Sequence, residues 1–274
     1  MGSKKRPVPT PLAGASGLID AHTHLTSCPD EPEAVVQRAR AAGVDALVTV
    51  GDGLEEAEQA LEVATQLDRV WAACAIHPTR ARELDDSARE RLTQLAQNPQ
   101  CVSIGETGLD TYWIGKQDWC APLEVQEEAL RFHIDLAVES GKALMIHNRE
   151  ADADLMRVLA SAPQPETVIL HCFSSPLEVA QQAWERGYVL SFAGNVTFKR
   201  NDYLREAAAQ VPLDQILYET DAPYMTPEPF RGARNEPAFI GHTAACIAHA
   251  RGMELAEFTA AAAENFRRVY QLDT

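Results

Sequence analysis

Short apolar runs recur along the chain, and each ends in polar or small residues. Eight such runs occupy residues 17–25, 45–51, 70–78, 101–110, 143–149, 167–173, 188–194 and 215–224. Most are nearly continuous in apolar character instead of alternating with polar positions. That pattern is typical of strands buried on both faces, as in a parallel sheet.

Stretches with helical spacing separate several of these runs. Apolar side chains recur three and four positions apart within residues 32–42, 54–67, 123–139 and 177–186. Strands that alternate with amphipathic helices predict a parallel sheet covered by helices. Eight such units in about 250 residues indicate an α/β fold of the (β/α)8 TIM barrel class, formed as a single domain. Two further helical stretches, 238–252 and 254–271, would complete the outer layer.

An open, doubly wound sheet is the main alternative to the barrel. Such a sheet normally has a glycine-rich phosphate-binding turn after its first strand. Here the corresponding segment is DAHTHLTSCPD, residues 20–30, which contains no glycine. We therefore predict a barrel domain over residues 17–274. Residues 1–16, which lack the apolar segment of a secretion signal, are predicted to form a flexible N-terminal tail.

The composition is that of a globular protein, with 46% hydrophobic and 23% charged residues. No apolar run approaches the roughly 20 residues that a membrane helix needs. The six cysteines are scattered and form no C-x-x-C pair, which favours reduced thiols in a cytoplasmic protein. We expect no membrane association, and the sequence indicates no obligatory protein partner.

The formal net charge of −16 argues against a protein that coats nucleic acid without specificity, because such proteins present a basic surface. It does not exclude an enzyme that acts on nucleic acid. A few local cations, including bound metal ions, can hold a few phosphates against an unfavourable overall field.

Ionisable residues lie at the C-terminal ends of the predicted strands. In LIDAHTHL, residues 18–25, the side chains of His22 and His24 would share one face because alternate positions of a strand point the same way. The other strand ends carry His77, Glu106, His147, His171 and Asp221. In a barrel these ends form one rim, where active sites are built. We therefore predict that these side chains meet in one small volume.

The residue types suit a pair of divalent cations. Neutral imidazoles and carboxylates favour zinc, manganese, iron or magnesium. Four histidines and two carboxylates are too many ligands for a single open site, and one carboxylate can bridge two cations about 3.5–4 Å apart. The pattern predicts metal-assisted hydrolysis. Less specific interpretations remain, with His22 and His24 as hydrogen-bonded polar groups, His77 as a strand terminator before proline, and Asp221 as a turn residue.

The order of motifs along the chain points to a known family. From about residue 17 onward the sequence contains, in order, DAHTHL, AIHP, IGETGLD, IHNREA, HCFSS, LSFAGNVTFK, ETDAPYMTP, RGARNEP and ENFRRVYQL. This ordered set resembles the TatD family of metal-dependent deoxyribonucleases. The resemblance implies an amidohydrolase-like barrel with a two-metal site, and a hydrolase acting on the phosphodiester bonds of nucleic acid.

The resemblance also implies a role for each rim residue. His22, His24 and Asp221 resemble ligands of the first metal, and Asp221 is in addition a predicted general base. Glu106 resembles the carboxylate that bridges the two metals, while His147 and His171 resemble ligands of the second. His77 resembles a catalytic contact to the substrate phosphate.

Substrate contacts are predicted on the rim loops. Arg149, two residues after His147, would share the inward face of its strand and contact a phosphate, and Arg234 is a second predicted substrate-binding cation. Aromatic rings on these loops would stack with bases of a single strand or simply cover the barrel; they are Tyr112, Trp113, Trp119, Tyr224 and Phe230. The segment GLDTYWIGKQDWCAP, residues 108–122, is longer and richer in tryptophan than the family pattern leads us to expect.

These observations favour a deoxyribonuclease that removes nucleotides from single-stranded DNA ends through a water activated by two metal ions, which would be Mg, Mn or Zn. Few cations in a protein with a large acidic excess suit an enzyme that contacts only a few phosphates at a strand end. Two alternatives stay open. One is a hydrolase of another ester or amide, such as D-aminoacyl-tRNA, at the same site. The other is a metal-binding protein without catalytic activity.

Overall fold

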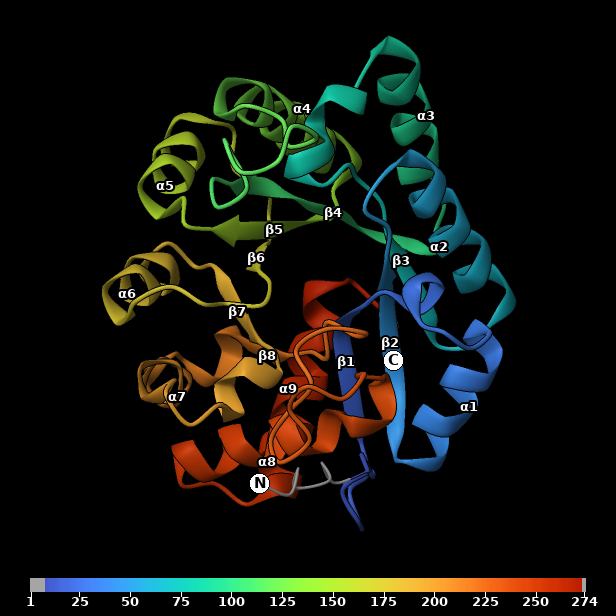
Figure 1. The fold of residues 1–274 in the computed structure, drawn as a ribbon, viewed down its shortest axis with the longest axis vertical. Coiled ribbons are helices and arrows are strands. Elements are labelled where there is room, and N and C mark those ends of the chain that lie inside the picture. The colour runs from blue at the N-terminus through green and yellow to red at the C-terminus, as the bar shows by residue number, and fades with distance from the viewer. Residues whose placement is uncertain (1–7, 273–274) are drawn as a thin grey trace, which may run out of the picture.

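Eight parallel strands form one sheet in the computed structural model, which describes residues 8–272. The strands follow one another around the sheet in chain order (Figure 1). They are β1 (Leu18–Thr23), β2 (Val44–Val50), β3 (Val70–Ala73), β4 (Cys101–Asp110), β5 (Ala143–Arg149), β6 (Val168–Leu170), β7 (Val189–Phe192) and β8 (Ile216–Tyr218). Each lies within a predicted run or within one residue of it, and the (β/α)8 barrel is confirmed.

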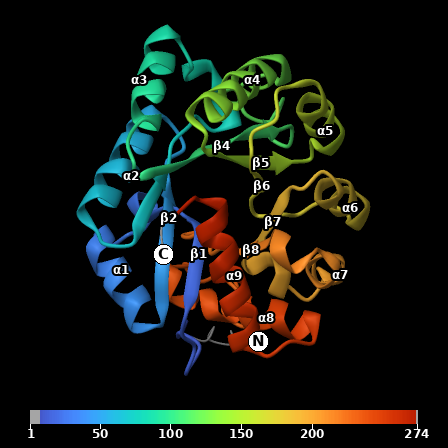
Figure 2. The ribbon, with the colours of Figure 1, turned by 180° about the vertical axis from the view of Figure 1, so that it is seen from behind.

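Helices surround the sheet when it is seen from either side (Figures 1 and 2). They are α1 (Pro32–Ala41), α2 (Leu54–Gln66), α3 (Asp86–Ala96), α4 (Leu123–Ser140), α5 (Asp152–Ser161), α6 (Leu177–Glu185), α7 (Asp202–Gln210), α8 (Ile240–Arg251) and α9 (Leu255–Val269). Short 3-10 helices are η1 (Leu25–Ser27), η2 (Pro78–Glu83), η3 (Gly194–Thr197), η4 (Leu213–Gln215) and η5 (Pro237–Phe239). The six predicted helical stretches are confirmed, whereas α3, α5 and α7 were not predicted individually.

The barrel is nearly closed, and side chains complete the seam between β8 and β1. Backbone ladders join each strand to the next from β1 to β8. At the seam, Asp20 accepts hydrogen bonds from the backbone N–H and the hydroxyl of Thr220, at 2.8 and 2.5 Å. The N–H of Asp221 donates to the carbonyl of His22 at 2.9 Å. These bonds fix the end of β8 against the two histidines of β1.

Helix α9 covers this seam. Figures 1 and 2 both show it between β8 and β1. The Tyr270 hydroxyl donates to the carbonyl of Ala21 at 2.9 Å, and the Asn265 side-chain amide donates to the carbonyl of Ile216 at 2.9 Å. Phe258 and Phe266 of the same helix are fully buried. The apolar face of α9 therefore protects the part of the barrel that backbone ladders leave least supported.

The predicted N-terminal tail is described only in part, because residues 1–7 lie outside the described residues. Residues 8–16 form no helix or strand, and the carbonyl of Thr10 accepts a hydrogen bond from His242 of α8 at 2.8 Å. None of the helices within residues 8–272 has the length and apolar character to cross a membrane.

Candidate active site

A pocket of about 900 Å³ opens at the carboxyl ends of the strands. Its lining includes His24, His77, Glu106, His147, Arg149, His171 and Asp221. His22 lies fully buried beneath it, with its Nε2 atom 3.1 Å from Nε2 of His24. Residues that are up to 199 positions apart in the chain (22 and 221) thus meet at one end of the barrel.

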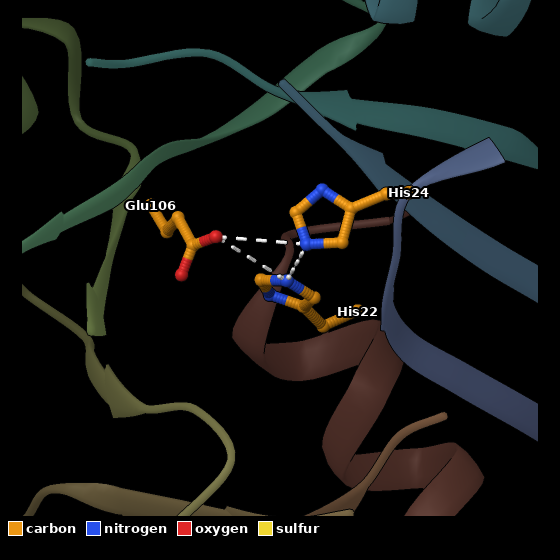
Figure 3. Close-up of side chains that lie close together, drawn as sticks. All are labelled: His22, His24 and Glu106. Atoms are coloured by element: carbon orange, nitrogen blue, oxygen red, sulfur yellow. Dashed lines mark hydrogen bonds and ion pairs between the residues drawn. The ribbon is translucent and has the colours of Figure 1, made fainter. Parts of the chain in front are cut away.

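One group of ligand atoms gathers at the ends of β1 and β8. The Nε2 atoms of His22 and His24 lie 3.5 and 3.4 Å from Oδ1 of Asp221. Oε1 of Glu106 lies 3.9 Å from the first of these nitrogens and 3.6 Å from the second. Figure 3 shows the Glu106 carboxylate facing both rings across a short gap. Two imidazoles and two carboxylates therefore converge on one point.

A second group gathers around the other oxygen of Glu106. Oε2 lies 2.6 Å from Nε2 of His171 and 3.2 Å from Nδ1 of His147. Nε2 of His77 lies 3.3 Å from Nδ1 of His147. Within the described residues, Nε2 of His171 is buried without a hydrogen bond of good geometry, although it points at the cluster. Glu106 thus stands between two sets of histidines, with one oxygen toward each.

Two glycines bring Glu106 to this position. A Cβ atom on Gly105 would lie 2.4 Å from Cβ of Met145, and one on Gly108 would lie 1.9 Å from the carbonyl oxygen of His147. Gly108 also has φ of +142°, which side chains rarely tolerate. Only glycine at these places lets β4 approach β5 closely enough to set Glu106 beside His147.

Carboxylates behind the histidines hold two of the rings. Oδ2 of Asp110 lies 3.1 Å from Nε2 of His147, and Oε1 of Glu219 lies 3.0 Å from Nδ1 of His171. Glu219 also accepts hydrogen bonds from the Cys172 N–H and the Ser191 hydroxyl. A metal-ligating histidine characteristically gives its second nitrogen to such a partner, which fixes its tautomer and orientation. Both rings therefore present the opposite nitrogen to the cluster.

His24 is held in a comparable way from the end of β2. Its Nδ1 atom lies 3.1 Å from the carbonyl oxygen of Val50 and 3.4 Å from Oδ1 of Asp52. Asp52 lines the pocket, so a further carboxylate faces the first group of ligand atoms.

Asp52, Asp110 and Glu219 were not predicted as site residues, although the sequence carries a signal for the first two. Asp110 lies four positions after Glu106 on the same strand and so shares its face. Asp52 follows an apolar run, as the predicted rim residues do.

The charge balance of the cluster favours cations. Burial opposes ionisation of Glu106, but the charge of His171 and the hydrogen bond with His147 hold the pKa of that carboxyl well below its usual range. Burial also works against protonation of His24, yet Asp52 and Asp221 raise the pKa of its imidazole to about 10. The carboxylates thus draw protons onto buried rings. Metal ions compete with protons for such nitrogens, so the residues present fit divalent metal.

The remaining predicted residues lie at different distances from this cluster. Arg149 lies on the pocket wall, with its Cζ atom 3.8 Å from the centroid of the Tyr112 ring. Arg234 is exposed and does not line the pocket. Phe230 is 6% exposed and packs beside Phe239, so its ring is not available for stacking with a base.

Comparisons with known proteins agree with this geometry. The family model described as "TatD related DNase" matches residues 19–271. A protein of Mycobacterium tuberculosis, named "Uncharacterized metal-dependent hydrolase TatD", is 47% identical over 93% of this chain and 98% of its own length. A protein of Enterobacter lignolyticus, named "3'-5' ssDNA/RNA exonuclease TatD", is 32% identical over 92% of this chain and 98% of its own length.

A solved structure shows the same fold. The crystal structure of YJJV, a TatD homologue from Escherichia coli K12, superposes with a TM-score of 0.87. It is 28% identical in sequence, and the match covers 94% of this chain and 99% of that one. The similarity therefore extends over the whole barrel and its rim.

Proposed function

The chain belongs to the TatD family of metal-dependent hydrolases, and from this premise we propose that it cleaves phosphodiester bonds at single-stranded nucleic-acid ends. The observation that carries the proposal is the position of Glu106 in an open pocket, with one oxygen toward His22 and His24 and the other toward His147 and His171. A carboxylate so placed suits a bridge between two cations.

We assign the metal ligands in two sets that share Glu106. The first set is His22, His24, Glu106 and Asp221, and the second is Glu106, His147 and His171. The two sets adjoin, since ligand atoms of His22, His171 and Asp221 also lie within 4.8 Å of one another. The ions would be Mg, Mn or Zn, since imidazole and carboxylate ligands suit all three. When bound, a pair of such ions lowers the pKa of water and polarises a phosphoryl oxygen.

Asp221 is the group we assign as general base. Its Oδ1 atom lies 3.4 Å from His24 Nε2, on the floor of the pocket, and its side chain is 11% exposed. The carboxylate is therefore in reach of a water that attacks a phosphorus atom above the cluster. In this position it can accept the proton that the water loses.

His77 is the group we assign to the substrate phosphate. Its Nδ1 atom accepts a hydrogen bond from the Thr79 N–H at 3.2 Å, so Nε2 carries the ring proton. Burial lowers the pKa of His77 to about 3, and the ring is neutral near pH 7. Nε2 lies 3.3 Å from Nδ1 of His147, so its proton would be available to a phosphate oxygen once that nitrogen holds a metal ion.

Nucleic acid is the substrate class that the relatives support. The Enterobacter lignolyticus protein is named as an exonuclease of single-stranded DNA and RNA. The pocket of this chain has arginine and tryptophan on one wall, which suit phosphate and base. A net charge of −16 would keep the rest of the strand away from the surface, so that only its end is held.

The test is a digestion ladder from a 5'-labelled, single-stranded oligonucleotide, with purified protein and added Mg, Mn or Zn. We expect stepwise shortening from one end, loss of cleavage with a chelator, and recovery on adding metal. Glu106→Gln should lower the rate by at least about 1,000-fold with the fold retained, because a neutral amide cannot bridge two cations.

Two results would contradict the proposal. One is cleavage by Glu106→Gln at the wild-type rate, and the other is equal cleavage of circular and linear strands. A charged tRNA assayed in parallel distinguishes attack at phosphorus from attack at an ester carbonyl.

A further inference from the structure

The loop between β4 and α4, residues 111–122, forms one wall of the pocket. Trp113 and Trp119 both line it, with ring centroids 5.7 Å apart and planes inclined by 47°. Trp119 is 56% exposed, although it is among the largest apolar side chains of the protein. A tryptophan left open to solvent at the mouth of a pocket offers its face to a planar ligand.

Hydrogen bonds fix the backbone of this wall. Arg82 donates to the carbonyls of Asp118, Trp119 and Cys120, at 3.3, 3.4 and 2.9 Å. Oδ1 of Asp110 accepts from the Trp113 N–H at 3.3 Å. The backbone at both tryptophans is therefore held before a ligand arrives, which reduces the entropy lost on binding.

The same wall is connected to the metal-ligand cluster. Asp110, which holds the Trp113 backbone through one oxygen, holds Nε2 of His147 through the other at 3.1 Å. The Asp110 carboxylate thus contacts both the backbone of the wall and a histidine of the second set of ligands. A base on the wall would belong to a nucleotide next to the phosphate being cleaved.

Arg149 supplies an unpaired cation at this wall. Its Cζ atom lies 3.8 Å from the centroid of Tyr112 and 5.5 Å from that of Trp113. Within residues 8–272 no carboxylate forms an ion pair with it, whereas Arg80, also at the pocket, pairs with Glu56 and Glu83. The Arg149 guanidinium therefore has no carboxylate partner and can bind an anionic oxygen, while the two tryptophans contact the face of a base.

The opposite side of the mouth lacks this combination. Tyr224 and Met225, after β8, are 54% and 36% exposed and also line the pocket. The neighbouring lining residues on that side include Asp52 and Asp221, and the lining cation Arg80 is already paired with Glu56 and Glu83. Among the lining residues that the structure describes, an arginine without an ion-pair partner lies beside aromatic rings only on the wall built by residues 111–122 and Arg149.

We propose that Trp113, Trp119 and Arg149 form a binding site for one nucleotide that flanks the scissile phosphate, with the base stacked on the tryptophans and a phosphate oxygen on the arginine. This inference rests on the proposed function and adds the element that selects single strands. In a duplex both faces of an internal base are covered by its neighbours, and an end base is paired. A tryptophan platform therefore favours an unpaired end, with little dependence on base identity.

The experiment combines protein variants with abasic substrates. An abasic unit is placed in turn at each of the first four nucleotides from the end that is digested. We expect Trp119→Ala to lower kcat/KM on the intact oligonucleotide by about 10- to 100-fold, the range of one lost stacking contact. Trp119→Phe, which keeps an aromatic face, should stay within about threefold of wild type.

The effects of Trp119→Ala and of the abasic unit on kcat/KM should not add when the abasic unit replaces the stacked nucleotide. With the abasic unit at one position, kcat/KM of the wild type should fall by the same factor as Trp119→Ala causes on intact DNA. The abasic unit at that position should not lower kcat/KM of Trp119→Ala any further. Tyr203→Ala is the control, since Tyr203 is 40% exposed and does not line the pocket. The proposal would be overturned if the effects of Trp119→Ala and of the abasic unit on kcat/KM multiplied at all four nucleotides. It would also be overturned if Trp119→Ala left kcat/KM unchanged.

Binding gives a second readout that does not need cleavage. Anisotropy of a labelled single strand, measured on Glu106→Gln with Mg²⁺ present, should show weaker binding by the same factor when Trp119→Ala is added. Binding that depends on Trp119 without any cleavage by wild-type protein would contradict the proposed function and leave the stacking site standing. Equal binding with and without the tryptophan would reject the stacking site alone.

Discussion

At the scale of single residues, Asp110 connects the metal-ligand cluster with the substrate wall. It orients His147 through Oδ2 and has a pKa held below its usual range by that histidine, against the effect of burial. Asp110→Asn keeps the size and the contact to the Trp113 N–H but removes the charge. We expect metal affinity to fall by about 10- to 100-fold, as is typical when such a partner is lost. Titration of the apoprotein with Mn²⁺ checks this, and unchanged affinity would show that His147 needs no such partner.

His77 gives a prediction about pH. Because its pKa is lowered to about 3, its ring stays neutral from pH 5.5 to 8.5 and its N–H donor is present throughout. His77→Gln should lower kcat/KM by about 10- to 1,000-fold. The ratio of wild type to variant should remain constant over that pH range. A ratio that changes tenfold near pH 6.5 would mean that His77 acts as a titrating acid or base instead of a neutral donor.

At the scale of elements, α4 fixes the segment after β3 and the interior of β4 through one buried histidine. His133 accepts a hydrogen bond from the Ile76 N–H at Nε2, 3.3 Å away, and its Nδ1 atom lies 2.7 Å from the Ala129 carbonyl oxygen and 3.0 Å from the Thr107 hydroxyl. Ile76 precedes His77, and Thr107 follows Glu106. The helix thereby holds two site residues in register, although His133 itself lies outside the pocket.

This histidine predicts a loss of stability in acid. Burial lowers the pKa of His133 from 6.5 to about 4, so the unfolded chain binds more protons than the folded one between these values. The free energy of unfolding therefore falls as pH drops below 6.5, by about 2 kcal/mol between pH 7.5 and pH 5 for this group. His133→Gln should be less stable at pH 7.5 and should lack this part of the slope. Urea unfolding of both proteins at fixed metal concentration checks it, and equal slopes would contradict it.

The elements differ in how far their sequences predict them. The strands are nearly continuous in apolar character and were located within a few residues, whereas the predicted run 70–78 continues past the end of β3 at Ala73. After Ala73 the chain no longer belongs to the sheet and continues as a loop at the rim of the barrel. Helix α3 carries only four buried residues among eleven, Ala88, Leu92, Leu95 and Ala96, and α7 buries mainly alanine. Such narrow faces give little periodic signal, because short helices on a barrel contact the sheet through few side chains.

At the scale of the whole molecule, barrel topology made the site predictable. Seven rim residues were identified because parallel strands bring their carboxyl ends together, and the structure does place them together. The sequence does not show the direction of Glu219, because this residue follows the end of β8, where the alternation of a strand no longer applies. Arg234, in contrast, was predicted to bind substrate but does not line the pocket. A cation on a rim loop is not thereby at the pocket, because loop direction depends on contacts that periodicity does not report.

The overall charge leads to a prediction about salt. With a net charge of −16 and one unpaired arginine at the wall, binding of a single strand should involve about two phosphates, the scissile one and the one on Arg149. Each contact contributes about −0.7 to the slope of log K against log salt, so the slope should be near −1.4 and affinity should fall less than about tenfold from 50 to 200 mM salt. Arg149→Gln should reduce the slope by about 0.7, whereas Arg234→Gln, outside the pocket, should leave it unchanged. Anisotropy titrations at constant Mg²⁺ measure all three slopes. A wild-type slope steeper than about −4 would mean that the strand is gripped along an extended surface, and an equal effect of the two arginines would mean that the phosphate contact is not localised at the wall.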